Sequence, residues 1–97
     1  MTYEIVIRPL AAKQTTLAYE WYEEKLQGLG DEFLSCIDAQ LLLILNNPFI
    51  YQIKYKNVRI GLIDRFPFGI YYFIDSLKIV VLSILHLSRS NDFLINR

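Results

Sequence analysis

The spacing of apolar residues changes along the chain, and each change predicts a new element. The run Tyr-Glu-Ile-Val-Ile-Arg over residues 3–8 is rich in β-forming residues and stops at Pro9, which predicts a short first strand. From residue 10 the apolar positions recur every three or four residues, which predicts a helix over residues 10–27. Its apolar face is expected at Leu17, Ala18, Trp21 and Tyr22, opposite a solvated face that carries Glu20, Glu23 and Glu24.

The next segment predicts a second helix, over residues 31–46. Gly28 and Gly30 separate it from the first helix, because glycine adopts the left-handed conformation of a helix end at little cost. The sequence Asn-Asn-Pro at 46–48 stops it. So short a connection between the two helices predicts an antiparallel helical hairpin. The buried stripe is expected at Phe33, Ile37, Leu41, Ile44 and Leu45, widened by Leu34, Leu42 and Leu43.

Three β-rich runs fill most of the second half, over residues 58–65, 68–75 and 78–87. The links between them are too short for parallel crossovers, which need about a dozen residues, so we expect an antiparallel meander. Residues 49–57 mix aromatic and lysine side chains without a period, which indicates a loop with a possible short strand. Residues 90–97 read as a polar tail.

These elements predict one α+β domain over residues 1–97, in the order β-α-α-β-β-β. An N-terminal strand and a helical hairpin would pack on the antiparallel meander. Residues 68–73 and 79–82 are apolar on both faces, as expected of strands that are covered on each side. The hairpin can cover one face, which leaves the other for a dense core or for a partner.

The composition narrows the class of protein. Hydrophobic residues make up 54% of the 97 residues, a high share for a small monomer, so an apolar patch covered by a partner is one outcome. A single cysteine, Cys36, excludes an internal disulfide and a cysteine-based zinc site, and we expect no metal and no cofactor. The N-terminus does not resemble a signal peptide and no apolar run reaches the ~20 residues of a membrane span, so a cytoplasmic protein without membrane contact is expected.

The net charge of zero hides an asymmetry between the two halves. Residues 1–47 hold seven acidic and three basic side chains, and residues 48–97 hold three acidic and seven basic ones. If the halves form different faces, one face is weakly cationic and suits a phosphate or an acidic protein. The alternative is that the two halves pair with each other.

Two arginines in the run 58–65 are candidates for a binding site. Strand alternation places Arg59 and Arg65 on one face with Gly61 between them, which would leave an open surface for a phosphate or a carboxylate. The opposite face is expected to be core, at Val58, Ile60 and Leu62. The alternative is that each arginine pairs with a nearby acid, at Asp64, Asp75 or Glu4.

His86 is the only histidine and a candidate general acid or base. Arg89 follows three residues later, so in a straight strand the two side chains would point to opposite faces, and they converge only if the chain turns after His86. The alternative is a hydrogen-bonded structural histidine. No Walker loop, glycine-rich dinucleotide motif or serine elbow is present.

The order and spacing of several short motifs resemble the RelE/ParE superfamily of toxins from type II toxin–antitoxin systems, often called plasmid stabilisation proteins. A strand, a helical hairpin and an Asn-Pro stop precede Arg-Phe-Pro-Phe-x-Ile-Tyr-Tyr over residues 65–72. Val-Leu-x-Ile-Leu-His-x-x-Arg follows over residues 81–89. Each piece is common by itself, and their combination in so short a chain is what carries the resemblance.

The resemblance implies a bacterial toxin that a small antitoxin neutralises by wrapping around it, as a hetero-oligomer or with the toxin as a homodimer. The antitoxin would cover the second face of the sheet and the extra leucines of the second helix, with contacts at Leu34, Leu42, Leu43, Tyr71 and Phe73. RelE-type members resemble ribonucleases that cut mRNA on the ribosome. ParE-type members are similar in fold and act on DNA gyrase.

The residues favour the ParE-like branch. A ribonuclease would draw on His86, Arg59, Arg65 and Arg89 for chemistry, and on Lys54, Lys56 and the same three arginines to bind RNA or another target. No tyrosine follows Tyr72 and no glutamate follows Glu32, so the Glu, Arg and His-Tyr set of some ribonuclease members cannot be assembled. Inhibition of DNA gyrase is therefore the first expectation, with a ribosome-dependent mRNA endoribonuclease and a non-toxic, protein-binding relative of the fold as alternatives.

Overall fold

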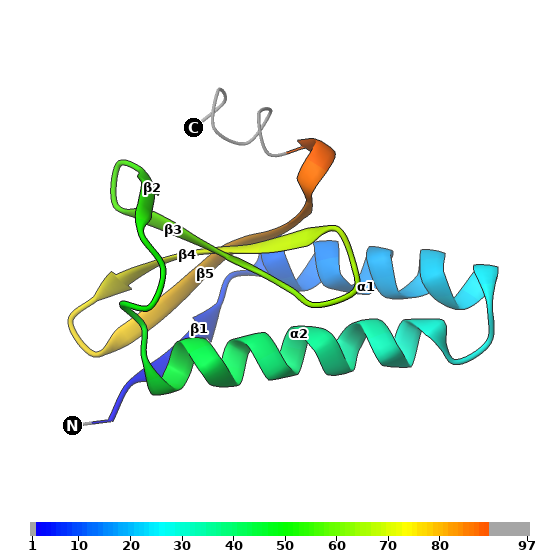
Figure 1. Cartoon of the computed structure of the whole chain (residues 1–97), viewed down its shortest axis with the longest axis horizontal. Coiled ribbons are helices and arrows are strands. Elements are labelled where there is room, and N and C mark those ends of the chain that lie inside the picture. The colour runs from blue at the N-terminus through cyan, green and yellow to red at the C-terminus, as the bar shows by residue number, and fades with distance from the viewer. Residues whose placement is uncertain (1, 90–97) are drawn as a thin grey trace.

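A computed structural model describes residues 2–89 and confirms the α+β class (Figure 1). The helices are α1 (Pro9–Lys25) and α2 (Leu29–Asn46), and a short 3-10 helix, η1 (Leu87–Arg89), ends the described part. The strands are β1 (Glu4–Ile7), β2 (Ile53–Tyr55), β3 (Val58–Leu62), β4 (Phe68–Asp75) and β5 (Lys78–His86). The predicted tail, residues 90–97, lies outside the described residues.

The strands form one five-stranded sheet in the order β1-β5-β4-β3-β2. From β2 to β5 each strand runs antiparallel to its neighbour, which confirms the meander and adds β2 to it. β1 joins at the far edge, parallel to β5, with Ile5 opposite Ile79. A parallel partner is possible there because the rest of the chain forms the connection between the two strands.

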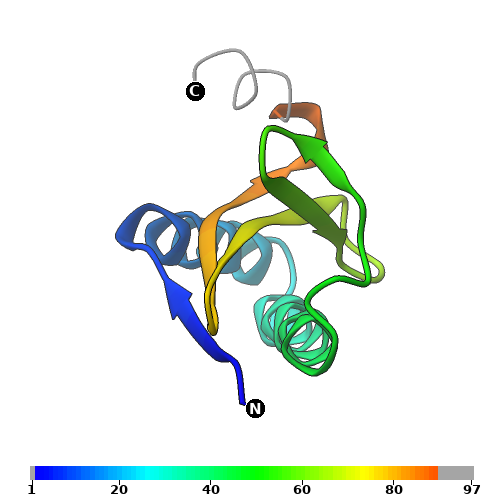
Figure 2. The same ribbon diagram turned by 90° about the vertical axis from the view of Figure 1, so that its left-hand side faces the viewer.

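Both helices cover the same face of this sheet (Figure 2). The side chains that point from the sheet toward them are fully buried, among them Ile70, Tyr72, Ile79 and Val81. Where the hairpin turns, four aromatic rings pack together with centroids 4.9 to 6.1 Å apart. This aromatic cluster consists of Tyr22, Phe33, Phe66 and Phe68.

A smaller apolar cluster lies on the opposite face of the sheet. Val58, Tyr71 and Leu82 are buried in it, and the half-buried side chains of Ile60, Phe73 and Leu85 pack against them. Neither α1 nor α2 lies on this face (Figure 2). The second face of the sheet is thus apolar, as predicted.

The predicted faces of β3 are partly wrong. Gly61 does not leave an open surface: a Cβ there would lie 3.1 Å from the Tyr51 ring and 3.2 Å from Ile44 Cδ1. Leu62, expected in the core, is 56% exposed. The difference arises because the segment before β2 folds back over Gly61, so that the glycine side of the strand meets α2.

The strand is also shorter than the predicted run 58–65. It ends at Leu62, and Arg65 has a left-handed φ of 68° in the loop that follows. This loop turns Phe66 inward to the aromatic cluster, which a continuing strand could not do. The loop therefore ends the alternation that would have placed Arg59 and Arg65 on one face.

The connection between the helices is tied by a glutamate. The Glu23 carboxylate accepts hydrogen bonds from the N–H groups of Gly28 and Gly30, both at 2.9 Å. Gly28 has a φ of 90°, as predicted for a helix end, whereas Gly30 lies within α2 rather than before it. A Cβ at Gly30 would lie 2.8 Å from the Tyr19 carbonyl oxygen, so only glycine lets the two helices approach this closely.

We predict that Glu23→Gln lowers the free energy of unfolding by about 1–2 kcal/mol, because one N–H at the start of α2 loses its acceptor and the helix dipole loses a negative charge. Glu24→Gln is the matched control, since Glu24 is exposed and no hydrogen bond or ion pair of its side chain is observed within residues 2–89. Urea unfolding followed by far-UV circular dichroism measures both. Equal losses in the two variants would contradict the role of Glu23.

A second prediction concerns Tyr72, whose hydroxyl donates a 2.9 Å hydrogen bond to the Pro48 carbonyl. Burial raises the pKa of Tyr72 from 10.0 to about 12, and the charge of Arg59 offsets part of this effect. Between these two values the folded chain keeps a proton that the unfolded chain loses, so this contribution to stability falls as the pH rises.

We therefore expect Tyr72→Phe to cost about 1 kcal/mol at pH 8, where the hydrogen bond is lost, and this cost to shrink or reverse between pH 10 and 12. Urea unfolding of the unmodified chain and of Tyr72→Phe at pH 8, 10 and 11 measures this cost. The titration of the other tyrosines cancels in the difference because both chains contain them. A difference that stays constant across this range would show that Tyr72 does not titrate as its burial implies.

Candidate functional site

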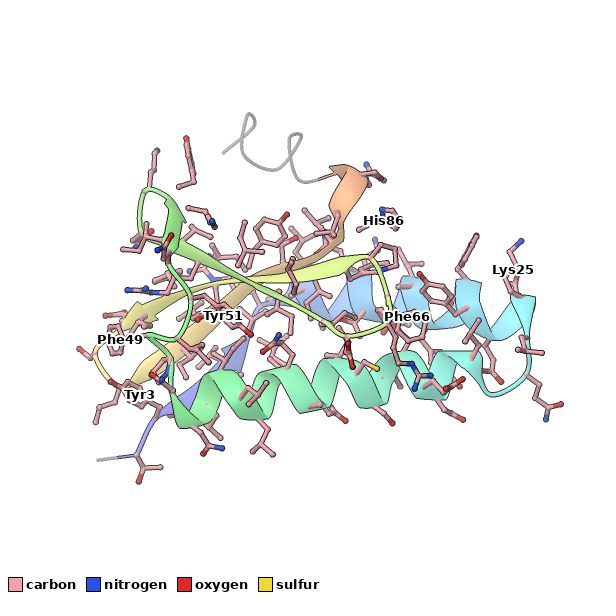
Figure 3. The ribbon with its side chains drawn as sticks, viewed as in Figure 1. Tyr3, Lys25, Phe49, Tyr51, Phe66 and His86 are labelled. Carbon is pink, nitrogen blue, oxygen red and sulfur yellow. The ribbon has the colours of Figure 1, made fainter. Side chains whose placement is uncertain are left out.

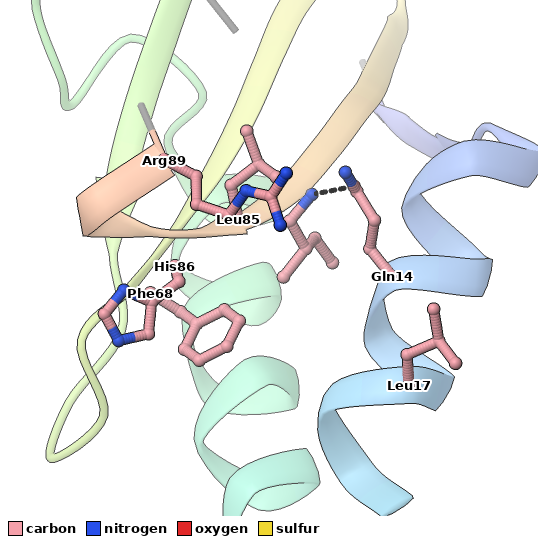
Figure 4. A pocket seen from close by; sticks show the side chains of 7 residues that line it. Gln14, Leu17, Phe68, Leu85, His86 and Arg89 are labelled. Carbon is pink, nitrogen blue, oxygen red and sulfur yellow. Dashed lines mark hydrogen bonds between the residues drawn. The ribbon is translucent and has the colours of Figure 1, made fainter. Parts of the chain in front are cut away.

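The chain turns directly after β5, and this turn brings His86 and Arg89 together. η1 begins at Leu87, so Arg89 folds back and lines the same hollows as His86 (Figure 4). Because the strand does not continue past His86, the two residues line the same hollows instead of opposite faces of the sheet.

His86 is held by its own turn. Its Nδ1 accepts the backbone N–H of Ser88 at 3.1 Å and lies 2.9 Å from Ser88 Oγ. Because a backbone N–H can only donate, Nδ1 is an acceptor and the proton of the neutral ring is on Nε2. The ring also packs edge-on against Phe68, with centroids 5.3 Å apart.

Two adjoining hollows lie between α1 and the end of β5, with volumes of about 300 and 400 Å³. They share Phe68, His86 and Arg89, so we treat them as one feature, the α1 groove. The smaller hollow is completed by Gln14, Leu17, Ile84 and Leu85 (Figure 4). The larger one is completed by Ala18, Trp21 and Tyr22.

Gln14 fixes the two walls of the α1 groove to each other. Its Oε1 accepts a hydrogen bond from Ser83 Oγ at 2.7 Å. It also accepts one from the Ile84 N–H at 2.9 Å (Figure 4). The strand pairing shifts nearby, between Tyr71 and Tyr72, as at a β-bulge. A polar side chain on the inner side of α1 is the sequence signal that could have indicated a hydrogen bond between this helix and the sheet.

Arg59 is engaged at the other end of the sheet. Its Nη1 donates to the Tyr51 carbonyl, and its guanidinium carbon lies 5.1 Å from the centre of the Phe49 ring. Phe49 and Tyr51 both belong to the segment that precedes β2 (Figure 3). Arg59 thus anchors this segment to β3, and no acid is its partner within residues 2–89.

Arg65 forms an ion pair with Glu32 of α2, and this pairing raises the pKa of its guanidinium. The two side chains are 60% and 49% exposed, so the pair lies at the surface. The alternative that Arg65 pairs with an acid is thus confirmed, but its partner is Glu32 rather than Asp64, Asp75 or Glu4. The acid comes from the first turn of α2, which only the packing of the hairpin under the β3–β4 loop could bring near.

The two candidate lysines lie on the β2–β3 hairpin. Lys54 and Lys56 are exposed, and Lys56 takes the turn with a φ of 53° while its Nζ lies 5.5 Å from the centre of the Tyr55 ring. They carry positive charge that remains accessible to a partner.

The four residues considered for ribonuclease chemistry do not form one cluster. Arg59 is paired across the sheet with Tyr72, and Tyr72 with Val81, whereas His86 lies five residues further along β5. At roughly 3.3 Å per residue this places Arg59 about 16 Å from His86 along the strands alone. Arg65 is paired with Glu32 of α2, so of the four only His86 and Arg89 line the same hollows.

The five residues expected to bind an antitoxin differ in exposure. Leu42 and Leu43 are 59% and 52% exposed on α2. Leu34 and Phe73 are half-buried, and Tyr71 is fully buried in the smaller apolar cluster. Their role in binding stays a prediction.

Sequence reasoning missed the accessible apolar residues of α1. Periodicity places Leu17 and Trp21 on its apolar face, yet each is 55% exposed. Ala18 and Tyr22 of the same face are half-buried. The apolar face of α1 is wider than the area that α2 and β5 cover, and periodicity alone does not report where coverage ends.

Neither a metal nor a membrane segment is indicated by the described residues. Within residues 2–89 no three side chains of His, Cys, Asp or Glu come together to hold an ion. None of the described helices is both long and apolar enough to cross a bilayer.

Comparisons with known proteins agree with the fold. A family model described as "ParE toxin of type II toxin-antitoxin system, parDE" matches residues 5–91. A solved structure, "Chromosomal ParDE TA system from P. aeruginosa", superposes with a TM-score of 0.77 at 17% identity and covers 88% of this chain and 96% of that chain. No curated protein matches in sequence. These findings confirm the predicted resemblance to the RelE/ParE superfamily and its fold.

We predict that Arg59→Ala lowers the free energy of unfolding by about 1–2 kcal/mol, because a hydrogen bond and a ring contact are lost from a half-buried site. Arg65→Ala is the matched control and should leave the urea midpoint unchanged, since an exposed ion pair contributes little. A loss at position 65 as large as that at position 59 would contradict this assignment.

Proposed function

The chain belongs to the ParE toxin family of type II toxin–antitoxin systems, and we propose that it arrests growth by binding DNA gyrase rather than by cutting RNA. The observation that carries the proposal is the dispersal of the four residues that the sequence offers as candidates for RNA cleavage. Cleavage requires a proton donor or acceptor and stabilising charges within hydrogen-bond reach of one phosphate. Two of the three arginines are instead engaged with Tyr51 and Glu32.

A binding mechanism uses what the surface does offer. Lys54 and Lys56 are exposed on a hairpin at one end of the sheet, and Arg89 is exposed at the other. Positive charges on a small rigid domain suit an acidic protein surface or the DNA held by the target. We assign target binding to these three residues.

Neutralisation by a cognate antitoxin accounts for the apolar surface. Leu42 and Leu43 on α2, and Leu17 and Trp21 on α1, are each more than half exposed. Exposed apolar side chains in neighbouring turns of a helix are typical of surfaces that a partner covers. We propose that the antitoxin binds on the helical hairpin, over α1, α2 or both.

A second candidate is a ribosome-dependent mRNA endoribonuclease. The presence of both His86 and Arg89 in the lining of the α1 groove favours it, because an imidazole and a guanidinium are together a minimal pair for proton transfer and phosphate binding. A third candidate is a relative of the fold that binds a protein without being toxic.

Induction of the chain without its neighbouring gene tests the proposal. We expect growth arrest with DNA breaks and an SOS response, and we expect the purified chain to inhibit supercoiling by gyrase. A chain with a stop codon at Lys13 is the control. Transcript cleavage within reading frames without DNA breaks would replace gyrase by mRNA as the target, and absence of arrest would favour the non-toxic binding protein.

A further inference from the structure

The α1 groove combines an apolar floor with exposed apolar walls. Leu17 and Trp21 are one helical turn apart on α1, and each is 55% exposed. Phe68, which is 8% exposed, forms the floor between them and β5. A single exposed leucine is ordinary on a protein surface, but two such side chains beside a hollow form a continuous apolar patch.

The groove also carries a positive charge at its β5 side. Arg89 is exposed, and no ion pair of its guanidinium is observed within residues 2–89. Among the described residues that line the groove, none is acidic. His86 lines the same hollows, and since Ser88 occupies its Nδ1, its Nε2 is left as a hydrogen-bond donor.

We propose that the α1 groove binds a protein segment that carries a large apolar side chain next to a carboxylate. The apolar side chain lies on Leu17, Trp21 and Phe68, and Arg89 holds the carboxylate with the paired hydrogen bonds that a guanidinium makes. The inference rests on the proposed function, in which such a segment belongs to the antitoxin.

The charges around the groove favour a peptide over a nucleic acid. Arg89 is its only lining residue with a permanent positive charge among those described, and one further cation, Lys25, lies beside it with its Nζ 4.9 Å from the centre of the Trp21 ring. A phosphate backbone requires several cations along its path, more than these two side chains supply. The volumes of about 300 and 400 Å³ fit one or two side chains.

Nuclear magnetic resonance titration of the ¹⁵N-labelled full chain, made by cell-free synthesis, tests the binding chemistry directly. The probe is indole-3-propionate, and indole-3-propionamide is the matched control with the same ring and no charge. We expect shifts at the Trp21 indole N–H and at the amides of residues 84–89, with binding of the acid about five- to tenfold tighter than that of the amide. Arg89→Gln should abolish this preference, and Arg65→Gln should keep it.

Several outcomes would overturn the proposal. Equal affinity for the acid and the amide would show that the groove does not recognise a carboxylate. Tighter binding of adenosine monophosphate than of the indole acid would assign the groove to nucleic acid. If the chain forms dimers that the probe dissociates, the groove would be assigned to a second copy of this chain. Probe binding that appears only after Asp92→Asn and Phe93→Ala would assign it to the chain's own tail.

Affinity for the protein encoded by the adjacent reading frame separates this inference from the proposed function. We expect Arg89→Gln to weaken that affinity about tenfold or more and Arg65→Gln to leave it unchanged. If the neighbour protein neutralises growth arrest and binds both variants equally, the antitoxin lies elsewhere and only the groove assignment fails. If the chain prefers the acid over the amide but causes no growth arrest, the groove assignment stands and the proposed toxic function is rejected.

Discussion

The packing of the aromatic cluster is the interaction on which the rest of the structure depends. Phe68 begins β4, and its ring contacts Tyr22 and Phe33 of the two helices at once. It therefore joins the sheet to the hairpin at the end where the helices are connected. Aromatic pairs contribute beyond the area they bury, because edge-on geometry aligns their quadrupoles.

This one constraint also positions the candidate site. Phe68 is paired with His86 across the sheet, so the ring that closes the core is also the floor of the α1 groove. Phe66 turns into the same cluster, which ends β3 at Leu62 and forces Arg65 outward to its ion pair with Glu32. The separation of the charged residues follows from the packing of the apolar ones.

Three polar side chains form hydrogen bonds with backbone groups, one of them within the hairpin and two between the hairpin and the sheet. Glu23 accepts two N–H groups at the start of α2, Gln14 accepts the Ile84 N–H, and Gln40 donates to the Leu62 carbonyl. An unpaired buried group costs more than its hydrogen bond contributes, so these side chains specify one arrangement of helices on sheet. The remaining exposed cations and apolar residues are those available to partners.

The sequence by itself determined which elements form, because local periodicity, glycines, prolines and loop lengths act within a few residues. These signals predicted the hairpin, the meander and the apolar second face. Only the tertiary structure decided which residues are covered by others: the Tyr51 ring packs over Gly61, whereas Leu17 and Trp21 stay exposed to solvent. The tertiary structure also decided which charged side chains lie near each other. Glu32 pairs with Arg65, 33 residues away in sequence, and the turn after β5 brings Arg89 into the same hollow as His86. Such contacts join segments whose distance along the chain carries no periodic signal, and they depend on which faces the aromatic cluster brings together.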